Sequence, residues 1–258
     1  MKIAAFNING IKARLPRLLE WLDETKPDVA CLQEIKSQDD GFPANEFEKV
    51  GYQAIWHGQK SFNGVAILVK DGLLLTERRR GLPGDESDDH ARYLEAEVEG
   101  VIIANLYLPN GNPHPGPKFD YKLAWMERLR AHMAQLWAEE LPAVVLGDFN
   151  VIPEDKDVWS PPAMADDALM QPASRDAYAR LLGDGWTDAI DTLNPRGGVW
   201  TFWDYQRGAW QRDHGFRIDH CLLSPELADR LEAAGVDKDA RGREKASDHA
   251  PVWVELRD

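Results

Sequence analysis

The chain has 258 residues, of which 43% are hydrophobic, and its 30 Lys and Arg against 44 Asp and Glu give a net charge of −14. This composition predicts one domain over residues 1–258 with a substantial core, and no apolar run reaches the roughly 18 residues of a membrane span. The acidic charge argues against non-specific adhesion to nucleic acid, although a divalent cation and a local basic patch would still admit a nucleic-acid enzyme.

Elements of the first quarter of the chain predict a strand–helix–strand unit. They are a strand at residues 2–6, a helix through Leu15, Leu18, Leu19 and Leu22 that ends near Thr25, and a strand at 29–32. The leucines have the spacing of one helix face, and the strands are short apolar runs. Asn7 directly follows the first strand, and Gln33 and Glu34 stand at the end of the second. The N-terminus lacks the apolar stretch of a signal peptide, so we expect a cytoplasmic protein.

The middle of the chain predicts a second unit of the same architecture. Residues 54–56, 64–69, 93–98 and 101–106 are strand candidates, and the segments 78–80 and 85–90 between them predict a charged loop. Residues 101–106, a helix at 121–140 and a strand at 143–146 then repeat the first construction, with Tyr107 and Asp148 after the two strands. A loop rich in Pro, Gly and Asn, residues 109–117, precedes the helix.

The last third has less regular patterning. Residues 154–174 predict a long irregular segment, followed by a short helix at 177–182, extended segments at 199–205 and 216–223, a helix at 225–234 and a last strand at 252–256. Cys31 and Cys221 lie in apolar strand candidates, and two such cysteines predict reduced core thiols rather than a disulfide framework or a zinc site.

Polar side chains recur at the ends of these strands, most clearly in the segment 141–153, where a buried run stops at Gly147 and presents Asp148 and Asn150. Each position also has an ordinary structural interpretation, such as a surface Glu34, a packed Tyr107 or a core His249. Their coincidence at one edge of an α/β sheet favours a site. The positions are Asn7, Glu34, Tyr107, Asp148, Asn150, Asp219, Asp248 and His249.

These residue types favour metal-assisted hydrolysis of a phosphate ester. Carboxylate and amide oxygens suit Mg²⁺, with Mn²⁺ as an alternative, and the sequence has no Cys/His cluster for zinc. A carboxylate and an imidazole beside a phosphodiester could activate water and oppose the charge that develops on the phosphate. A serine-nucleophile signature and a Gly-rich phosphate loop are both missing from the strand ends.

The chain resembles the exonuclease III family of abasic-site endonucleases, within the endonuclease/exonuclease/phosphatase superfamily. The resemblance rests on short segments in the family's order along nearly the whole chain: FNING from Phe6, PD at 27–28, LQE at 32–34, GVA from Gly64, LY and PN around Leu106–Asn110, GDFN from Gly147, RID from Arg217 and SDHAPV from Ser247. It implies a four-layered α/β sandwich of the DNase I-like type, in which two packed mixed β-sheets are flanked by helices.

The resemblance also implies roles for named residues. Catalysis would rest on Tyr107, Asp148, Asn150, Asp219 and His249, with Asp148 orienting or deprotonating water, and Asp219 orienting His249. The expected metal-binding set is Asn7, Glu34, Asp148, Asn150, Asp248 and His249. The expected substrate contacts are Phe202, Phe216 and Ile218 around a base-free sugar, neighbouring Trp203, and the cations Lys12, Arg14, Arg92 and Lys118 on the DNA backbone. Asn9 stands where some relatives carry Asp, which leaves a metal role there in doubt.

From this resemblance we expect a monomeric, Mg²⁺-dependent nuclease that cuts duplex DNA 5′ to abasic sites and trims 3′ ends, without membrane association. Two alternatives stay open at the level of the sequence. One is a phosphodiesterase of the same superfamily that acts on RNA, a lipid or a small phosphate ester. The other is a catalytically silent nucleic-acid-binding domain.

Overall fold

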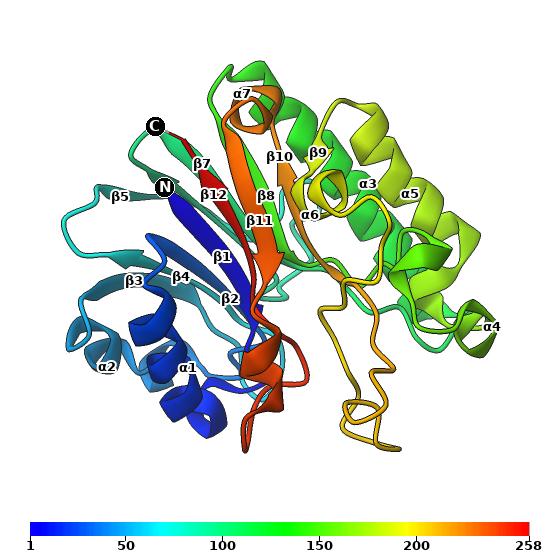
Figure 1. Cartoon of the computed structure of the whole chain (residues 1–258). Helices are drawn as coiled ribbons and strands as arrows, with labels where there is room; N and C mark the ends of the chain where they lie inside the picture. The colour runs from blue at the N-terminus through cyan, green and yellow to red at the C-terminus, as the bar shows by residue number, and fades with distance from the viewer. Residues whose placement is uncertain (258) are drawn as a thin grey trace.

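Two six-stranded mixed β-sheets packed face to face form the centre of the computed structural model, which describes residues 1–257 (Figure 1). One sheet has the strand order β11-β12-β1-β2-β4-β3 and the other β5-β6-β7-β8-β10-β9. The strands are β1 (Lys2–Asn7), β2 (Val29–Gln33), β3 (Tyr52–His57), β4 (Val65–Lys70), β5 (Leu75–Arg80), β6 (Tyr93–Val98), β7 (Val101–Tyr107), β8 (Ala143–Asp148), β9 (Thr187–Asp188), β10 (Asp219–Leu223), β11 (Leu231–Val236) and β12 (Val252–Leu256).

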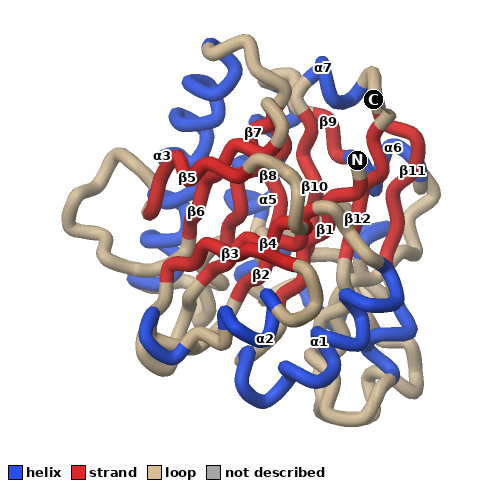
Figure 2. Tube along the Cα trace, turned by 90° about the vertical axis from the view of Figure 1, so that its left-hand side faces the viewer, coloured by secondary structure: helices blue, strands red, loops and turns tan. Residues whose placement is uncertain are grey.

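Helices cover the outer face of each sheet. The α-helices are α1 (Ile11–Thr25), α2 (Ala44–Glu48), α3 (Pro117–Ala138), α4 (Pro161–Met164), α5 (Pro172–Gly183), α6 (Ala189–Leu193) and α7 (Pro225–Ala228). In Figures 1 and 2, α1 and α2 lie beside the sheet that holds β1 to β4, and α3 and α5 lie on the far side of the other sheet. This confirms the predicted α/β sandwich with four layers.

Of the four clusters of buried apolar side chains, three correspond to the spaces between the layers. Alternate residues of β1 face opposite sides of their sheet: Ile3 and Ala5 join the core between the sheets, whereas Ala4 and Phe6 join the core under α1. The third core lies between the second sheet and the helices α3 and α5. Central strands covered on both faces are therefore continuously apolar, which explains why the sequence reveals them.

The predicted strand–helix–strand units form matching centres of the two sheets. β1 and β2, connected by α1, pair in parallel, as do β7 and β8, connected by α3. In each sheet the remaining pairings are antiparallel. The carboxyl ends of both parallel pairs meet at the end of the sandwich opposite the chain termini (Figure 1), so polar residues after these strands approach one another.

The structure corrects three local predictions. Residues 78–80, expected in a loop, belong to the edge strand β5, where Arg78 pairs with Glu95 of β6 at 3.0 Å. The helix expected at 225–234 ends at Ala228, and β11 follows it. Residues 199–205 form only isolated bridges at Phe202 instead of a strand. β5 and β11 are exposed sheet edges, so they lack the apolar pattern that identifies buried strands.

Candidate active site

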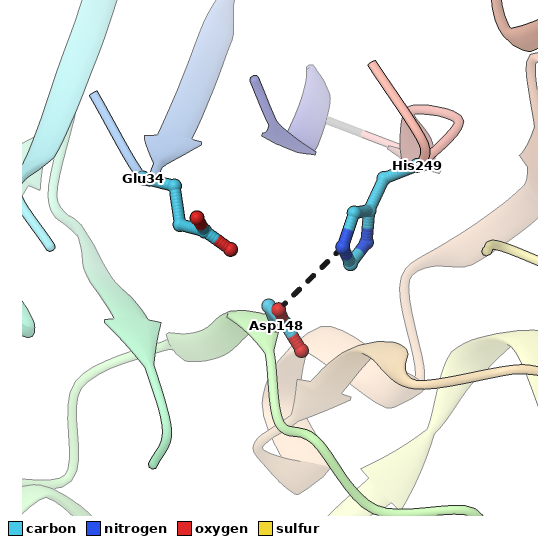
Figure 3. A group of neighbouring side chains, drawn as sticks. All are labelled: Glu34, Asp148 and His249. Atoms are coloured by element: carbon cyan, nitrogen blue, oxygen red, sulfur yellow. Dashed lines mark ion pairs between the residues drawn. The ribbon is translucent and has the colours of Figure 1, made fainter. Parts of the chain in front are cut away.

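Glu34, Asp148 and His249 lie close together at the end of the sandwich where the carboxyl ends of the parallel strands of both sheets meet (Figure 3). Glu34 follows β2 in one sheet, Asp148 ends β8 in the other, and His249 lies just before β12. One ligand atom from each lies within 4.8 Å of the others. The sequence-distant strand ends therefore build one compact group of two carboxylates and an imidazole.

Asn7 connects the two carboxylates of this group. Its Nδ2 amide donates to Oε1 of Glu34 and to Oδ2 of Asp148, each at 2.9 Å, and its side chain is fully buried. Its Oδ1 atom instead accepts from the backbone N–H of Asn9 at 3.1 Å. The structure thus places the donor of Asn7, not its oxygen, against the carboxylates, and this one amide connects the residue after β2 to the end of β8 in the other sheet.

His249 is held by Asp219. Its Nδ1 atom lies 2.8 Å from Oδ2 of Asp219, and its Nε2 atom lies 3.8 Å from Oδ2 of Asp148. Burial would lower the pKa of His249, but the charge of Asp219 and the hydrogen bond to it outweigh burial and raise the pKa to about 10. The ring is therefore an imidazolium at neutral pH, and its Nε2–H is directed toward the cleft.

The pKa values of the two carboxylates, Asp148 and Glu34, are shifted in opposite directions. Burial raises the pKa of Asp148 to about 7, against the attraction of His249. For Glu34, burial also favours the neutral form, but hydrogen bonds from Lys36 and Asn7 outweigh it and lower the pKa. The Lys36 ammonium lies 2.8 Å from Oε2 of Glu34. Glu34 is consequently an anion at neutral pH, whereas Asp148 can exchange a proton near neutral pH.

Tyr107 and Asn150 form the neighbouring wall. Burial and the charges of Glu34 and Asp148 raise the pKa of Tyr107 well above its usual 10, so its hydroxyl stays protonated and can donate. The backbone N–H of Asn150, a residue with a left-handed φ of 48°, donates to Oδ1 of Asp148 at 2.9 Å. Its side chain accepts from Nδ2 of Asn110 at 3.1 Å.

A cleft of about 750 Å³ opens over these groups, and nine of the predicted site residues line it. The nine are Glu34, Tyr107, Asp148, Asn150, Phe202, Phe216, Ile218, Asp248 and His249. The ring centres of Phe202 and Phe216 lie 4.7 Å apart, and those of Phe202 and His249 lie 5.0 Å apart. The structure thus brings an apolar wall directly beside the charged group.

Other predicted residues lie outside the cleft lining. Trp203 has 0% exposure and packs behind the cleft against Trp210. Of the four predicted cations, Lys12 and Lys118 are exposed, Arg14 donates to the hydroxyl of Tyr205 at 3.2 Å, and the guanidinium of Arg92 lies 4.7 Å from the ring centre of Tyr107.

Sequence reasoning missed several residues of the cleft and its support. Trp159 and His214 stack at 3.7 Å with an interplanar angle of 1° and line the cleft, and they come from two loops that have no regular pattern. Lys36, which pairs with Glu34, belongs to no recognised motif. Lys122 is buried, although a lysine at its helix position is expected to face solvent. Only tertiary contacts reveal these residues.

The donor chemistry of the group fits a divalent cation. Glu34 and Asp148 offer hard carboxylate oxygens, which Mg²⁺ and Mn²⁺ prefer, and Asp248 lies in the same cleft. Oδ1 of the buried Asp219, whose Oδ2 pairs with His249, has no hydrogen-bond partner among the described residues. Among residues 1–257, no helix combines the length and the apolarity needed to cross a bilayer.

Comparisons with known proteins agree with this geometry. The model of the endonuclease/exonuclease/phosphatase family matches residues 4–249. Exodeoxyribonuclease III of Haemophilus influenzae is 34% identical over the whole of both chains. Among solved structures, an AP endonuclease from Archaeoglobus fulgidus is 35% identical with a TM-score of 0.94, and a 3′ phosphatase from Neisseria, bound to a product DNA hairpin, is 36% identical with a TM-score of 0.96; each match covers both chains completely.

Proposed function

Because the chain belongs to the endonuclease/exonuclease/phosphatase family, we propose that it is a DNA-repair nuclease that hydrolyses the phosphodiester 5′ to abasic sites in duplex DNA with the help of Mg²⁺. Family membership confirms the predicted resemblance and the predicted class of enzyme. We propose further that the enzyme removes nucleotides and blocking groups from 3′ ends, and that it acts as a single-domain monomer in the cytoplasm.

The observation that carries this proposal is the meeting of Glu34, Asp148 and His249 within 4.8 Å beside an apolar wall. Glu34 and Asp148, with Asp248 near them, would hold the divalent ion, which when bound supplies Lewis-acid stabilisation of phosphate charge. Asp148, whose pKa burial raises to about 7, orients the attacking water and accepts its proton.

The scissile phosphate lies between three donors in this mechanism. The imidazolium of His249 donates through Nε2 and opposes the negative charge that develops on the phosphate oxygens. The hydroxyl of Tyr107 stays protonated and donates as well, and Asn150 contributes its amide. Asp219 acts on the phosphate only through His249, whose ring it holds in one orientation.

Substrate choice rests on the apolar wall of Phe202, Phe216 and Ile218. An apolar pocket beside the charged group fits a sugar that has lost its base, whereas an enzyme that acts on a lipid or an inositol phosphate would not need such a pocket. Lys12, Arg14, Arg92 and Lys118 are proposed to contact backbone phosphates, and a local cationic rim would offset the net charge of −14.

Three duplex oligonucleotides of the same sequence, labelled at the 5′ end, test this proposal. One contains a single synthetic abasic site, one ends in a 3′-phosphate, and one is intact. We expect a Mg²⁺-dependent cut 5′ to the abasic site, removal of the 3′-phosphate, and slower laddering of the intact duplex.

Each outcome has a distinct meaning. Removal of the 3′-phosphate without abasic cleavage would restrict the activity to 3′ ends and contradict the proposed abasic specificity. Failure on all three DNAs, with cleavage of RNA or a small phosphate diester by the same folded protein, would transfer the assignment to another branch of the superfamily.

A further inference from the structure

Lys122 is a fully buried lysine of α3 that lies directly behind the cleft. Its side chain has 0% exposure, although the residues on either side of it, Tyr121 and Leu123, are only half-buried. Burial of an ammonium group is costly unless the group is well compensated. A structural explanation alone would favour an apolar side chain here, since α3 otherwise packs through residues such as Trp125 and Leu129.

The ammonium of Lys122 binds the backbones of the two loops that form one wall of the cleft. Nζ donates to the carbonyl oxygen of Asn110 at 3.0 Å and to that of Asn150 at 2.5 Å. Both asparagines line the cleft, and their side chains are joined by the hydrogen bond from Nδ2 of Asn110 to Oδ1 of Asn150. The Nζ atom of one side chain therefore crosslinks the loop after β7 to the loop after β8.

Gly111 packs directly against the side chain of Lys122. A Cβ atom on Gly111 would lie 2.7 Å from Cδ of Lys122, closer than real side-chain atoms approach. Gly111 also has a φ of +92°, in the region that favours glycine. The loop that carries Asn110 is thus shaped to let the lysine stem pass beneath it.

We propose that Lys122 is a positioning residue, which aligns the side-chain amides of Asn110 and Asn150 along the cleft by holding their backbone carbonyls. The amide of Asn150 has little freedom in this arrangement: it donates to the carbonyl of Leu108 at 2.9 Å, and its own backbone N–H donates to Asp148. Displacement of either loop would move the amide and the carboxylate together. The functional part of this inference rests on the proposed phosphodiester hydrolysis.

Lys122→Met and Lys122→Arg test the proposal, with Leu129→Ala as a matched control. Met keeps the length of the side chain and removes its donors, whereas Arg keeps donors. Leu129 is a fully buried core residue of the same helix, so its truncation weakens packing without removing a hydrogen bond to the two loops. Assays are run at equal distance below each variant's Tm, so that lost stability affects all variants alike.

We expect Lys122→Met to lower kcat about 10- to 100-fold with KM for DNA nearly unchanged, because misplacement of a group by about 1 Å has effects of this size. Lys122→Arg should recover part of the loss, and Leu129→Ala should keep the wild-type kcat. In a double-mutant cycle, Lys122→Met should add little to Asn150→Ala, since it acts through that residue. A kcat equal to that of the control, or fully additive losses, would overturn the proposal.

A second readout needs no substrate. In protein labelled with ¹⁵N-asparagine, Lys122→Met should shift the side-chain amide signals of Asn110 and Asn150, and Leu129→Ala should leave them in place. Unmoved signals in Lys122→Met would overturn the positioning role. A wild-type enzyme that is inactive on DNA would refute the proposed function alone, because these signals would still decide for or against Lys122.

Discussion

Replacing Asp219 by Asn tests how the protein keeps His249 charged. The substitution preserves the shape of the side chain and removes the anion that lies 2.8 Å from Nδ1 of His249. In the wild type, Asp219 outweighs burial and raises the pKa of His249 from 6.5 to about 10. Without it, burial lowers the pKa, and the remaining carboxylates Asp148, Asp248 and Glu34 oppose the fall.

The size of the effect follows from these competing causes. The pKa of about 10 lies well above the ordinary histidine value of 6.5. Because Asp148 still attracts the imidazolium, we expect a fall of roughly 2 to 3 pH units, or about 3–4 kcal/mol against the charged ring. The group then loses its charge as the pH rises through this lower pKa, so activity of Asp219→Asn should decline with rising pH well before that of the wild type.

Two measurements check this prediction. The pH dependence of kcat/KM reports the loss of activity, and the Cε1–H signal of His249 reports the titration of the ring itself by NMR. Asp88→Asn, the same substitution 2.9 Å from the exposed His90 and outside the cleft lining, is the matched control and should leave the pH profile unchanged. An unaltered titration of His249 in Asp219→Asn would refute the electrostatic role of Asp219.

Two other substitutions probe the metal site and the support of the fold. Glu34→Ala removes a carboxylate of the proposed metal site, so the Mg²⁺ concentration for half-maximal activity should rise; an unchanged metal titration would exclude Glu34 as a ligand. Glu95 is 2% exposed, and despite its burial, hydrogen bonds from His132, Tyr93 and Arg78 lower its pKa from 4.5 to about 2. This depressed pKa contributes up to about 3 kcal/mol of stability above pH 4.5 that is lost as the pH falls through about 2. The Tm difference between wild type and Glu95→Gln should therefore shrink on acidification over that range, and Glu97→Gln, at the exposed end of the same Arg78 contact, should show a far smaller difference; a gap that stays constant with pH would contradict this linkage.

The sequence predicts the centre of the fold because burial leaves a local pattern there. β1, β2, β7 and β8 are covered on both faces, so each appears as an apolar run that ends in a polar residue. Once the carboxyl ends of these four strands are predicted correctly, Asn7, Glu34, Tyr107 and Asp148 are placed together at one end of the sandwich. By contrast, β5 and β11 are edge strands whose residues are mostly exposed or half-buried, and their patterns do not distinguish a strand from a loop or helix.

The site could be predicted where a residue ends a strand, and could not where it acts through tertiary contacts. Lys122 has no local pattern that predicts its burial. It is buried because the loop that carries Asn110 and Gly111 folds over its side chain. The family resemblance implies a place for Asn7 near the metal, but only the hydrogen bonds show that its amide donates to both Glu34 and Asp148. Side-chain orientation of this kind has no signature in a single sequence.

The central claim is that this cleft hydrolyses a phosphodiester through Asp148 and a divalent ion. Its most direct test is single-turnover cleavage of a 5′-labelled abasic duplex by wild type and Asp148→Asn, with and without EDTA, and identification of the product ends by mass spectrometry. We predict a fragment ending in a 3′-hydroxyl, formed by the wild type only with Mg²⁺, while Asp148→Asn binds the duplex and leaves it intact. Undiminished cleavage by Asp148→Asn, cleavage in EDTA, or a 3′ end carrying an unsaturated sugar from β-elimination would contradict the account.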